Sequence, residues 1–135
     1  MSMAKRTGPV IFSKIEPFAG LRKALEMGRV DVIETVRDSK IKGRGGAGFP
    51  TGVKWNLAAT ARSDKKFVIC NADEGEPGTF KDRILLTEYL PLIIEGMIIA
   101  AYAVGADAGF LYLRGEYAAF QKNIEEYLDT LRSDG

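Results

Sequence analysis

The order of apolar and polar residues changes early in the chain. Residues 1–17 hold one short apolar run between two prolines and show no helical repeat, which predicts an extended arm. Leu21 and Ala24, with the leucine that follows, then have the i, i+3, i+4 spacing of one helix face, and Gly28 would end that helix. We therefore expect the folded domain to follow the arm, over residues 18–135.

The next segment has the marks of a helix at both ends. Val32 and Ile33 belong to an apolar face with helical spacing, and Asp31 followed by Glu34 is typical of a capping box. Two lysines precede Gly43, as is common where a helix ends. We therefore expect a helix that ends at Gly43 and passes directly into a glycine-rich segment.

The second half of the chain alternates between strand and helix patterns. β-Branched and aromatic residues predict strands over residues 67–71 and 109–115. Residues 91–105 are apolar almost all round, which is typical of a buried helix, and residues 116–131 place their apolar positions on one helix face. Strand, helix, strand and helix in this order predict a parallel sheet with right-handed connections.

The predicted sheet is short of strands. A parallel sheet with helices against it usually has four or more, whereas this sequence shows two convincing ones. The expected fold class is therefore α/β: part of a Rossmann-like parallel sheet flanked by helices, preceded by the arm and by helices with a glycine-rich loop. We expect this fold to be incomplete, with a C-terminal remainder absent.

Composition and charge argue against several classes of function. The 19 basic and 18 acidic residues give a net charge of +1, so neither a nucleic acid nor an anionic membrane is an expected partner. A single cysteine, Cys70, and no histidine exclude an internal disulfide and the usual Cys/His metal sites, and Cys70 is interpreted as a small core residue. No apolar run has the length of a membrane span or a signal peptide, which favours a cytoplasmic location.

The glycine-rich segment satisfies a familiar pattern in the wrong context. Gly43, Gly45 and Gly48 fit G-x-G-x-x-G, the fingerprint of dinucleotide-binding folds. That fingerprint follows a strand and opens a helix, whereas this segment follows a predicted helix and runs into Pro50, which we expect to hinder immediate helix formation. A P-loop is excluded too, because Lys54 is not followed by serine or threonine.

The same segment could bind a ligand through its backbone. Five glycines within ten residues allow positive φ and let the chain lie against a planar or phosphate-bearing group, while Arg44 and Lys54 supply positive charge. Phe49 and Trp55 offer aromatic faces for stacking. The alternative is an ordinary surface loop with a helix-ending glycine, but this combination of residues favours binding.

A second polar group follows the first predicted strand. Asn71, Asp73, Glu74 and Glu76 come at its carboxyl end, where open α/β sheets bind ligands. Asn71 can donate and accept hydrogen bonds, and carboxylates accept them from a ribose hydroxyl or a flavin N–H. The alternative interpretation is a solvated acidic turn.

Together, these segments resemble one family. The run "GRGGAGFPTGVKW", followed by "CNADEGEPGTFKDR" and "EGMIIAAYAVGADAGFLYLRGEY", is similar to the FMN- and NADH-binding flavoprotein subunit of complex I. It is also similar to the large diaphorase subunits of NAD-reducing hydrogenases and NAD-linked formate dehydrogenases. The likeness runs from about residue 8 to the end of the chain, and the sequence of these motifs resembles that of the hydrogenase diaphorase most.

The resemblance implies a site for FMN with NAD(H) lying over it, in which hydride passes between the two and no catalytic side chain is needed. Phe49 would stack on the adenine and Glu76 would hold a ribose hydroxyl, whereas Leu57 stands where relatives commonly carry a second aromatic. The motifs and the resemblance together give these candidate cofactor-binding residues: Gly43, Arg44, Gly45, Gly46, Gly48, Phe49, Lys54, Asn71, Asp73, Glu74 and Glu76.

The resemblance also implies partners. Family members continue with a domain whose cysteines hold a [4Fe–4S] cluster, which the one cysteine here cannot do. We therefore expect the front part of a diaphorase or NADH dehydrogenase subunit, completed by the rest of that subunit, which passes electrons to iron–sulfur subunits of an NAD-linked complex. The alternatives are a non-catalytic fragment, a nucleotide-binding or docking module that needs other chains, and a phosphate-binding protein of another fold.

Overall fold

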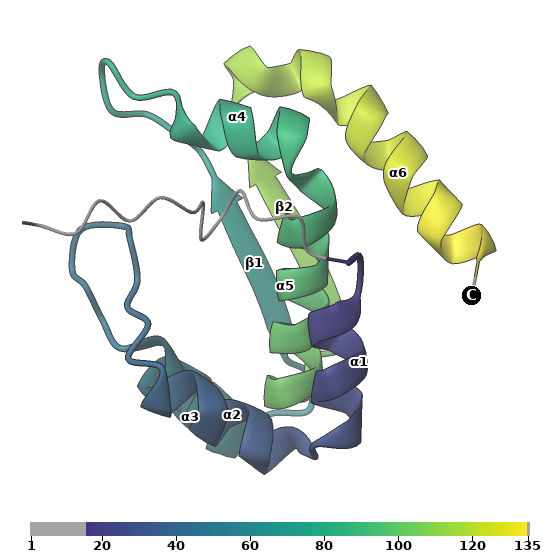
Figure 1. Cartoon of the computed structure of the whole chain (residues 1–135). Coiled ribbons are helices and arrows are strands. Elements are labelled where there is room, and N and C mark those ends of the chain that lie inside the picture. Colours follow the sequence, from purple (N-terminus) through teal and green to yellow (C-terminus); the bar gives the residue numbers. More distant parts are fainter. Residues whose placement is uncertain (1–15, 135) are drawn as a thin grey trace, which may run out of the picture.

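The computed structural model describes residues 16–134, in which two strands lie among helices (Figure 1). The predicted arm over residues 1–17 falls almost wholly outside the described residues, so the division of the chain at residue 18 stays a prediction. In chain order the elements are α1 (Ala19–Glu26), α2 (Arg29–Asp38), α3 (Thr51–Thr60), β1 (Phe67–Ala72), α4 (Lys81–Glu88), α5 (Leu90–Val104), β2 (Ala108–Leu113), the 3₁₀-helix η1 (Gly115–Phe120) and α6 (Gln121–Ser133).

The sheet within residues 16–134 consists of β1 and β2, which run parallel. Their register pairs Phe67 with Ala108 at one end and Ala72 with Leu113 at the other, so both strands end at the same edge. The helices α4 and α5 connect them, and α5 packs against both strands. The parallel α/β arrangement predicted from the sequence pattern is therefore confirmed.

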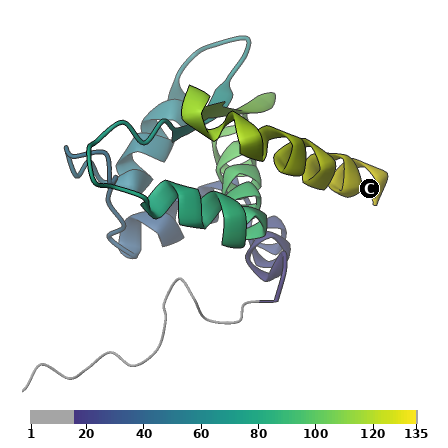
Figure 2. The same cartoon turned by 90° about the horizontal axis from the view of Figure 1, so that it is seen from above.

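Helix α5 is the element on which the other layers pack. It contacts the sheet as well as α1, α2 and α3, which gather at the end of the molecule away from α6 (Figures 1 and 2). Pro91 lies in its first turn and Gly105, with φ of 71°, closes it in the left-handed conformation. The prediction of a buried helix that ends at this glycine is confirmed, and its buried residues are Leu90, Ile94, Glu95, Ala100, Ala103 and Val104.

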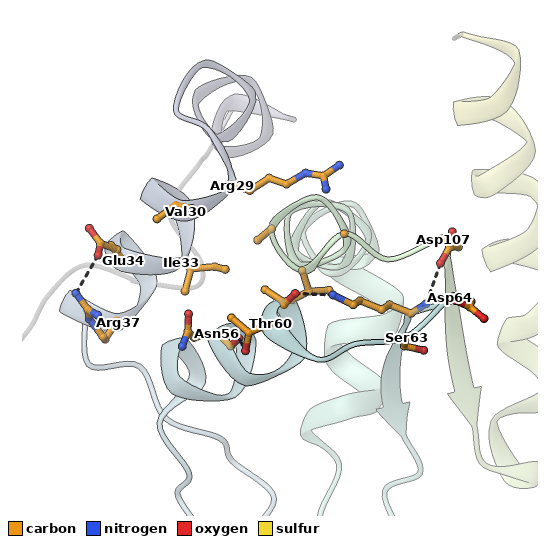
Figure 3. Close-up of a pocket in the computed structure, with 15 residues that line it drawn as sticks. Arg29, Val30, Ile33, Glu34, Arg37, Asn56, Thr60, Ser63, Asp64 and Asp107 are labelled. Carbon is orange, nitrogen blue, oxygen red and sulfur yellow. Dashed lines mark hydrogen bonds and ion pairs between the residues drawn. The ribbon is translucent and has the colours of Figure 1, made fainter.

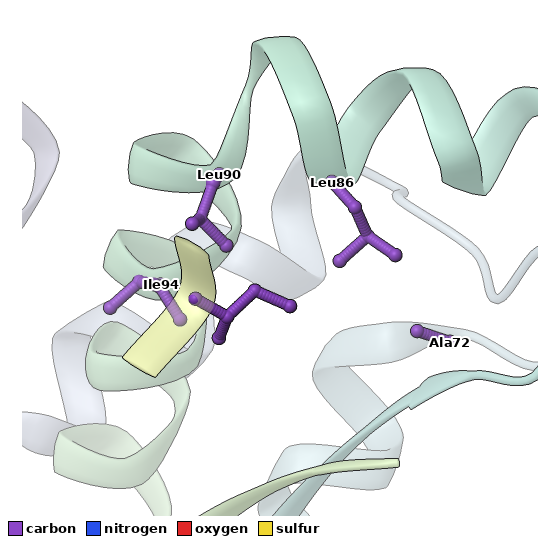
Figure 4. Packing of buried hydrophobic residues seen from close by; sticks show 5 residues of the cluster. Ala72, Leu86, Leu90 and Ile94 are labelled. Carbon is purple, nitrogen blue, oxygen red and sulfur yellow. The ribbon is translucent and has the colours of Figure 1, made fainter. Parts of the chain in front are cut away.

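Two apolar clusters lie around α5. One joins the sheet to α4, α5 and α6 through the buried side chains of Ala72, Leu86, Leu90, Ile94 and Ile124 (Figure 4). The other joins α1 and α2 to the far end of α5 through the buried side chains of Ala24, Val32, Ile33 and Ala103. The predicted faces are therefore confirmed at Ala24, Val32 and Ile33, whereas the leucine at position 25, which was assigned to the first helix face, is 56% exposed.

The last helix begins later than the pattern predicts. Residues 115–120 form the 3₁₀-helix η1, and α6 begins only at Gln121. The apolar face was predicted correctly, because Ile124 is buried and the other members of the face pack around the same cluster. These are Phe120, Tyr127, Leu128 and Leu131.

A buried carboxylate fastens α1 to α5. The Glu95 side chain accepts hydrogen bonds from the backbone N–H of Phe18, at 3.2 Å, and of Leu21, at 3.0 Å. Helix α1 has no side-chain cap of its own, since its N-cap position is Phe18 in the left-handed region, with φ of 60°. Glu95 thus satisfies N–H groups that a helix start leaves unpaired.

Both predicted ends of the second helix were wrong. Helix α2 begins at Arg29, with Gly28 as its N-cap and no side-chain cap hydrogen bond, so Asp31 lies inside the first turn instead of capping it. The helix ends at Asp38, well before Gly43. The left-handed turn that follows is made by Lys40, with φ of 57°, and a rule that looks for glycine misses it.

A helix was also missed directly after the glycine-rich segment. Helix α3 begins at Thr51, although Pro50 was expected to hinder an immediate helix. Proline restricts the residue before it, but its own φ of −62° is compatible with the residue that starts a helix. Gly52 lies inside α3 and is buried, because a Cβ there would stand 2.4 Å from the Cα of Arg37 in α2.

One face of the sheet is bare. Alternate residues of the strands lie on the side away from α5, and their side chains are exposed: Phe67, Ile69, Phe110 and Tyr112. The sheet predicted to be incomplete therefore lacks a covering layer within residues 16–134. Among these residues no single helix is long and apolar enough to cross a membrane, and only α4 with α5, across a bend of 93°, meets the length and composition criteria together.

The contact at Gly52 predicts a large effect of one methyl group. Gly52→Ala should lower the free energy of unfolding by about 1–3 kcal/mol, because backbone atoms of Arg37 must move away from the new Cβ. Gly96→Ala is the matched control, since Gly96 lies in α5 with nothing near its Cβ position, and it should stabilise by roughly 0.5–1 kcal/mol. Urea unfolding measures both, and equal effects would contradict the packing of α2 on α3.

The cap formed by Glu95 predicts a second effect on stability. Glu95→Ala should cost about 1–3 kcal/mol, because the first N–H groups of α1 lose their partner in a half-buried position. The exposed Glu88 provides the control, and Glu88→Ala should leave the urea midpoint almost unchanged. Amide exchange at Phe18 and Leu21 localises the loss, and unchanged protection there would disprove the assignment.

Candidate functional site

The two polar segments singled out in the sequence meet at the carboxyl end of β1. An open cleft of about 580 Å³ lies between the tip of the glycine-rich loop and the loop that follows β1. Its lining residues are Arg44, Gly45, Asn71, Asp73, Glu74, Gly75, Glu76, Lys81 and Asp82. This cleft, called here the acidic cleft, brings together six of the eleven candidate residues.

The end of β1 orients the first polar side chains of the acidic cleft. Asn71 is the fifth residue of β1 and is exposed on the bare face of the sheet. Its side-chain oxygen accepts a hydrogen bond from the backbone N–H of Asp73 at 3.0 Å, which turns the chain out of the strand. Asp73 and Glu76 are exposed, so their carboxylates can accept hydrogen bonds from a ligand.

Glu74 lies differently from its neighbours. Its side chain is buried, and both carboxylate oxygens accept from the backbone N–H of Asp82 at 3.2 Å, at the start of α4. The Tyr117 hydroxyl donates to it at 3.0 Å, and the Lys81 ammonium lies 3.7 Å away. Burial alone would raise the pKa of Glu74, but the Asp82 N–H and the Tyr117 hydroxyl, with further groups, hold that pKa below its ordinary value.

Two residues that bind Glu74 were not among the sequence candidates. Arg114 donates a hydrogen bond to the backbone carbonyl of Glu74, and Tyr117 donates to its carboxylate. Arg114 also pairs with Glu116, with nitrogen–oxygen distances of 3.0 and 2.5 Å, and this contact lowers the pKa of Glu116 to about 2. Arg114 and Tyr117 both belong to the segment "LRGEY". No local pattern in that segment shows that the end of β2 reaches the loop after β1.

The glycine-rich loop is closed at its base and open at its tip. The Gly43 N–H donates to the Phe49 carbonyl at 2.8 Å, and the Thr51 N–H donates to the Ile41 carbonyl at 2.9 Å. At the tip, Gly46 has a φ of 108°, in the region that favours glycine, and nothing lies within 4 Å of its Cβ position. The hydrogen bonds at the base therefore hold the loop, and its tip presents backbone beside the acidic cleft.

The remaining candidates are not all gathered in the acidic cleft. Gly43, Phe49 and Lys54 line a separate groove of about 330 Å³ between the loop, α3 and the start of β1. Gly46 and Gly48 line neither space. Trp55 contributes to the same groove, but its ring packs partly against the cluster of α1, α2 and α5.

A further cavity of about 480 Å³ lies at the opposite end of the strands, between α2, α3 and the end of α5 (Figure 3). Among its lining residues, Arg37 lies 3.4 Å from Glu34, and Asp107 accepts from the backbone N–H of Lys66 at 2.8 Å. It contains none of the candidate residues.

Cys70 occupies the other face of β1. The thiol is free and half-buried, and burial, followed by the nearby Asp82 carboxylate, raises its pKa. Within residues 16–134 no group of three or more potential ligands could hold a metal ion. The acidic cleft itself is lined by groups that form hydrogen bonds and carry charge.

Comparison with known proteins identifies the family to which these segments belong. The family model of the Nuo51 FMN-binding domain matches residues 36–135. The alpha subunit of the NAD-reducing hydrogenase HoxS of Cupriavidus necator is 50% identical over 135 residues, 99% of this chain and 22% of that protein. One subunit of the NADH-quinone oxidoreductase of Rhizobium meliloti is 44% identical over 119 residues, 87% of this chain and 28% of that protein.

A solved structure gives the same result. The crystal structure of an NAD⁺-reducing [NiFe]-hydrogenase in the H₂-reduced state superposes with a TM-score of 0.80 and 41% sequence identity, over 95% of this chain and 23% of that chain. The chain thus spans about a quarter of the length of these relatives. The resemblance inferred from the motifs is confirmed, and the match over residues 36–135 shows that the chain belongs to the Nuo51 FMN-binding domain family.

Proposed function

We propose that this chain supplies the N-terminal part of an FMN site at which NAD(H) is oxidised or reduced. The observation that carries this proposal is that the glycine-rich loop and the acidic loop line one cleft at the carboxyl end of β1. Ligands of open α/β sheets bind at such an edge. The names of the relatives agree, since they include an NAD-reducing hydrogenase and NADH-quinone oxidoreductases.

The groups that line the acidic cleft suit a nucleotide with a sugar-like chain and a phosphate. Exposed carboxylates of Asp73 and Glu76 can accept hydrogen bonds from hydroxyl groups, and Asn71 can donate as well as accept. Arg44 on the same lining supplies positive charge for a phosphate, whereas the Lys81 ammonium is paired with Asp82 at 2.6 Å. A cofactor of mixed hydroxyl and phosphate character therefore fits the residues present.

The candidate residues then have separate tasks. Gly43, Gly45, Gly46 and Gly48 let the backbone approach the flavin and its phosphate closely, with Arg44 and Lys54 beside them. Asn71 and Asp73 hold the flavin or its ribityl chain. Phe49, which is half exposed, offers a face for the adenine of NAD(H), and Glu76 holds a ribose hydroxyl.

The protein's part in the reaction is to position the two nucleotides. It does not have to transfer protons. When bound, FMN exchanges hydride with the nicotinamide and thereby couples two-electron to one-electron chemistry. The side chains around the acidic cleft orient the two nucleotides, and no side chain has to act as acid or base. Glu74, one of the candidate cofactor-binding residues, serves this site by holding the start of α4 with its carboxylate.

The rest of the function depends on other parts of the complex. We propose that electrons pass onward to iron–sulfur centres, of which a [4Fe–4S] cluster belongs to the further length of the same subunit and others to iron–sulfur partner subunits. This chain spans about a quarter of the length of its relatives. The alternatives are a fragment without turnover or a docking module, and a cytoplasmic location stays a prediction.

FMN binding is the first test. The full chain should quench the fluorescence of added FMN and should retain flavin absorbance near 450 nm that NADH bleaches without oxygen. Asp73→Ala should raise the dissociation constant about tenfold, or about 1.4 kcal/mol, because a carboxylate acceptor is lost. Asp64→Ala, at the opposite end of the strands, is the control and should bind like the wild type. Wild-type chain that leaves FMN fluorescence unchanged would refute the proposal.

Discrimination between NADH and NADPH tests the role of Glu76. A carboxylate that holds the adenosine ribose repels a 2′-phosphate, so Glu76→Gln should lower the ratio of the rates of FMN reduction by NADH and NADPH by about tenfold. The exposed Glu26 in α1 provides the control variant, Glu26→Gln. An unchanged ratio in Glu76→Gln would remove this residue from the nicotinamide nucleotide site.

A further inference from the structure

The loop that lines the acidic cleft is held from outside the cleft. Residues 73–80 connect β1 to α4 without regular structure, and Gly75, Glu76 and Gly78 within them are exposed. A loop of this composition loses much conformational entropy when it is held in one shape. Something must therefore fix it if it is to present carboxylates in defined positions.

The fixing contacts come from a segment about 40 residues further along the chain. Arg114 donates to the Glu74 carbonyl, and the Tyr117 hydroxyl donates to the Glu74 carboxylate at 3.0 Å. Parallel pairing makes this possible, because Ala72 pairs with Leu113 and both strands therefore end side by side. Arg114 follows β2 directly, and Tyr117 lies in η1 immediately after it.

The two side chains are themselves held in place. The Arg114 guanidinium lies 5.6 Å from the centre of the Tyr117 ring and is paired with Glu116 at 2.5 Å. The Tyr117 ring in turn lies 5.4 Å from that of Phe120, which packs on the core cluster of α5 and α6. A connected set of contacts thus runs from the core to Glu74, and we call Arg114 and Tyr117 the brace.

The brace does not belong to the lining of the cleft. Neither Arg114 nor Tyr117 is among the residues that face the acidic cleft, whereas Glu74, to which both are bonded, is. The Glu74 carboxylate also accepts from the Asp82 N–H at 3.2 Å and so ties the β1 end of the loop to the start of α4, where the loop's other end lies. Through this one residue the brace acts on both ends of residues 73–80.

We propose that Arg114 and Tyr117 are positioning residues that set the affinity of the acidic cleft for FMN by holding residues 73–80 through Glu74, without touching the ligand. The inference rests on the proposed function for the identity of the ligand. It adds that a binding loop on β1 is preorganised by side chains at the end of β2. Preorganisation raises affinity because less ordering remains to be done when the ligand binds.

The test uses the full chain with two measurements on each variant: hydrogen exchange of residues 73–80 without ligand, and the dissociation constant for FMN from fluorescence quenching. Tyr117→Phe removes one hydroxyl, and Arg114→Gln removes the donor to the Glu74 carbonyl. Both should speed exchange of this loop and raise the FMN dissociation constant about tenfold. Arg114→Lys should not restore affinity, because lysine lacks the planar fork that spans the Glu74 carbonyl and Glu116.

Matched controls separate this effect from general loss of packing. Tyr127→Phe removes a hydroxyl from a half-buried ring in α6, and Arg132→Gln removes an ion pair to Asp129 at 2.6 Å. Both should leave loop exchange and FMN affinity unchanged. Melting temperatures of all variants are compared, so that a fall in affinity with an unchanged melting temperature identifies positioning.

A double-variant cycle distinguishes action through Glu74 from direct contact with FMN. In a Glu74→Ala background, Tyr117→Phe should have no further effect on FMN affinity, because the acceptor of its hydroxyl is gone, whereas Arg114→Gln should still have one. A full additional loss for Tyr117→Phe would overturn the inference in favour of ligand contact. If Glu74→Ala does not fold, Tyr117→Phe and Arg114→Gln alone test the inference. Faster hydrogen exchange of residues 73–80 with a wild-type dissociation constant for FMN would then overturn it.

The failures of the two proposals are distinguishable. A wild-type chain that binds no FMN refutes the proposed function, and the inference about affinity falls with it. A wild-type chain that binds FMN, with both brace variants binding equally well, leaves the proposed function standing and refutes the inference alone.

Discussion

The parallel pairing of β1 with β2 is the constraint on which the rest of this structure depends. Parallel strands need a long crossover, and here α4 and α5 supply it, so the most apolar helix of the chain lies against the sheet. The same pairing makes both strands end at one edge. Asn71 and Arg114, far apart in sequence, are thereby brought to the same end of the molecule.

Glu74 helps to form the acidic cleft at the carboxyl end of the two strands. Carboxylates beside it are exposed and free to meet a ligand, whereas its own is buried and used by Asp82, Tyr117 and Lys81. A buried carboxylate is stable only when such partners are present. The loop thus contains exposed carboxylates that can face a ligand and, beside them, the buried Glu74 carboxylate that holds the loop in place.

The architecture also explains how two loops that are distant in sequence come to line one cleft. One helix, α5, has contacts with the sheet, with α1 through the Glu95 carboxylate, and with α2 and α3. These contacts support the glycine-rich loop on one side and the acidic loop on the other. The bare face of the sheet carries exposed aromatic and aliphatic side chains and has no covering layer among the described residues.

Local patterns determined much of this protein. The periodicities and the glycine at position 105 predicted both strands, the buried helix and the last helix face, because these depend mainly on neighbouring residues, although β2 ends at Leu113 and not at residue 115 as predicted. The end of α2 was not predictable in this way, since Lys40 adopts a left-handed turn that usually takes glycine, and neither was the contact of Gly52 with the backbone of Arg37. Helix α3 was missed for a local reason, because the φ of Pro50 suits the start of a helix. Sequence likewise identified the two polar loops and their family. Only the tertiary structure decided that six candidate residues share one cleft while Phe49 and Lys54 line another groove, and that Arg114 and Tyr117 hold Glu74, because these contacts join segments that are distant along the chain.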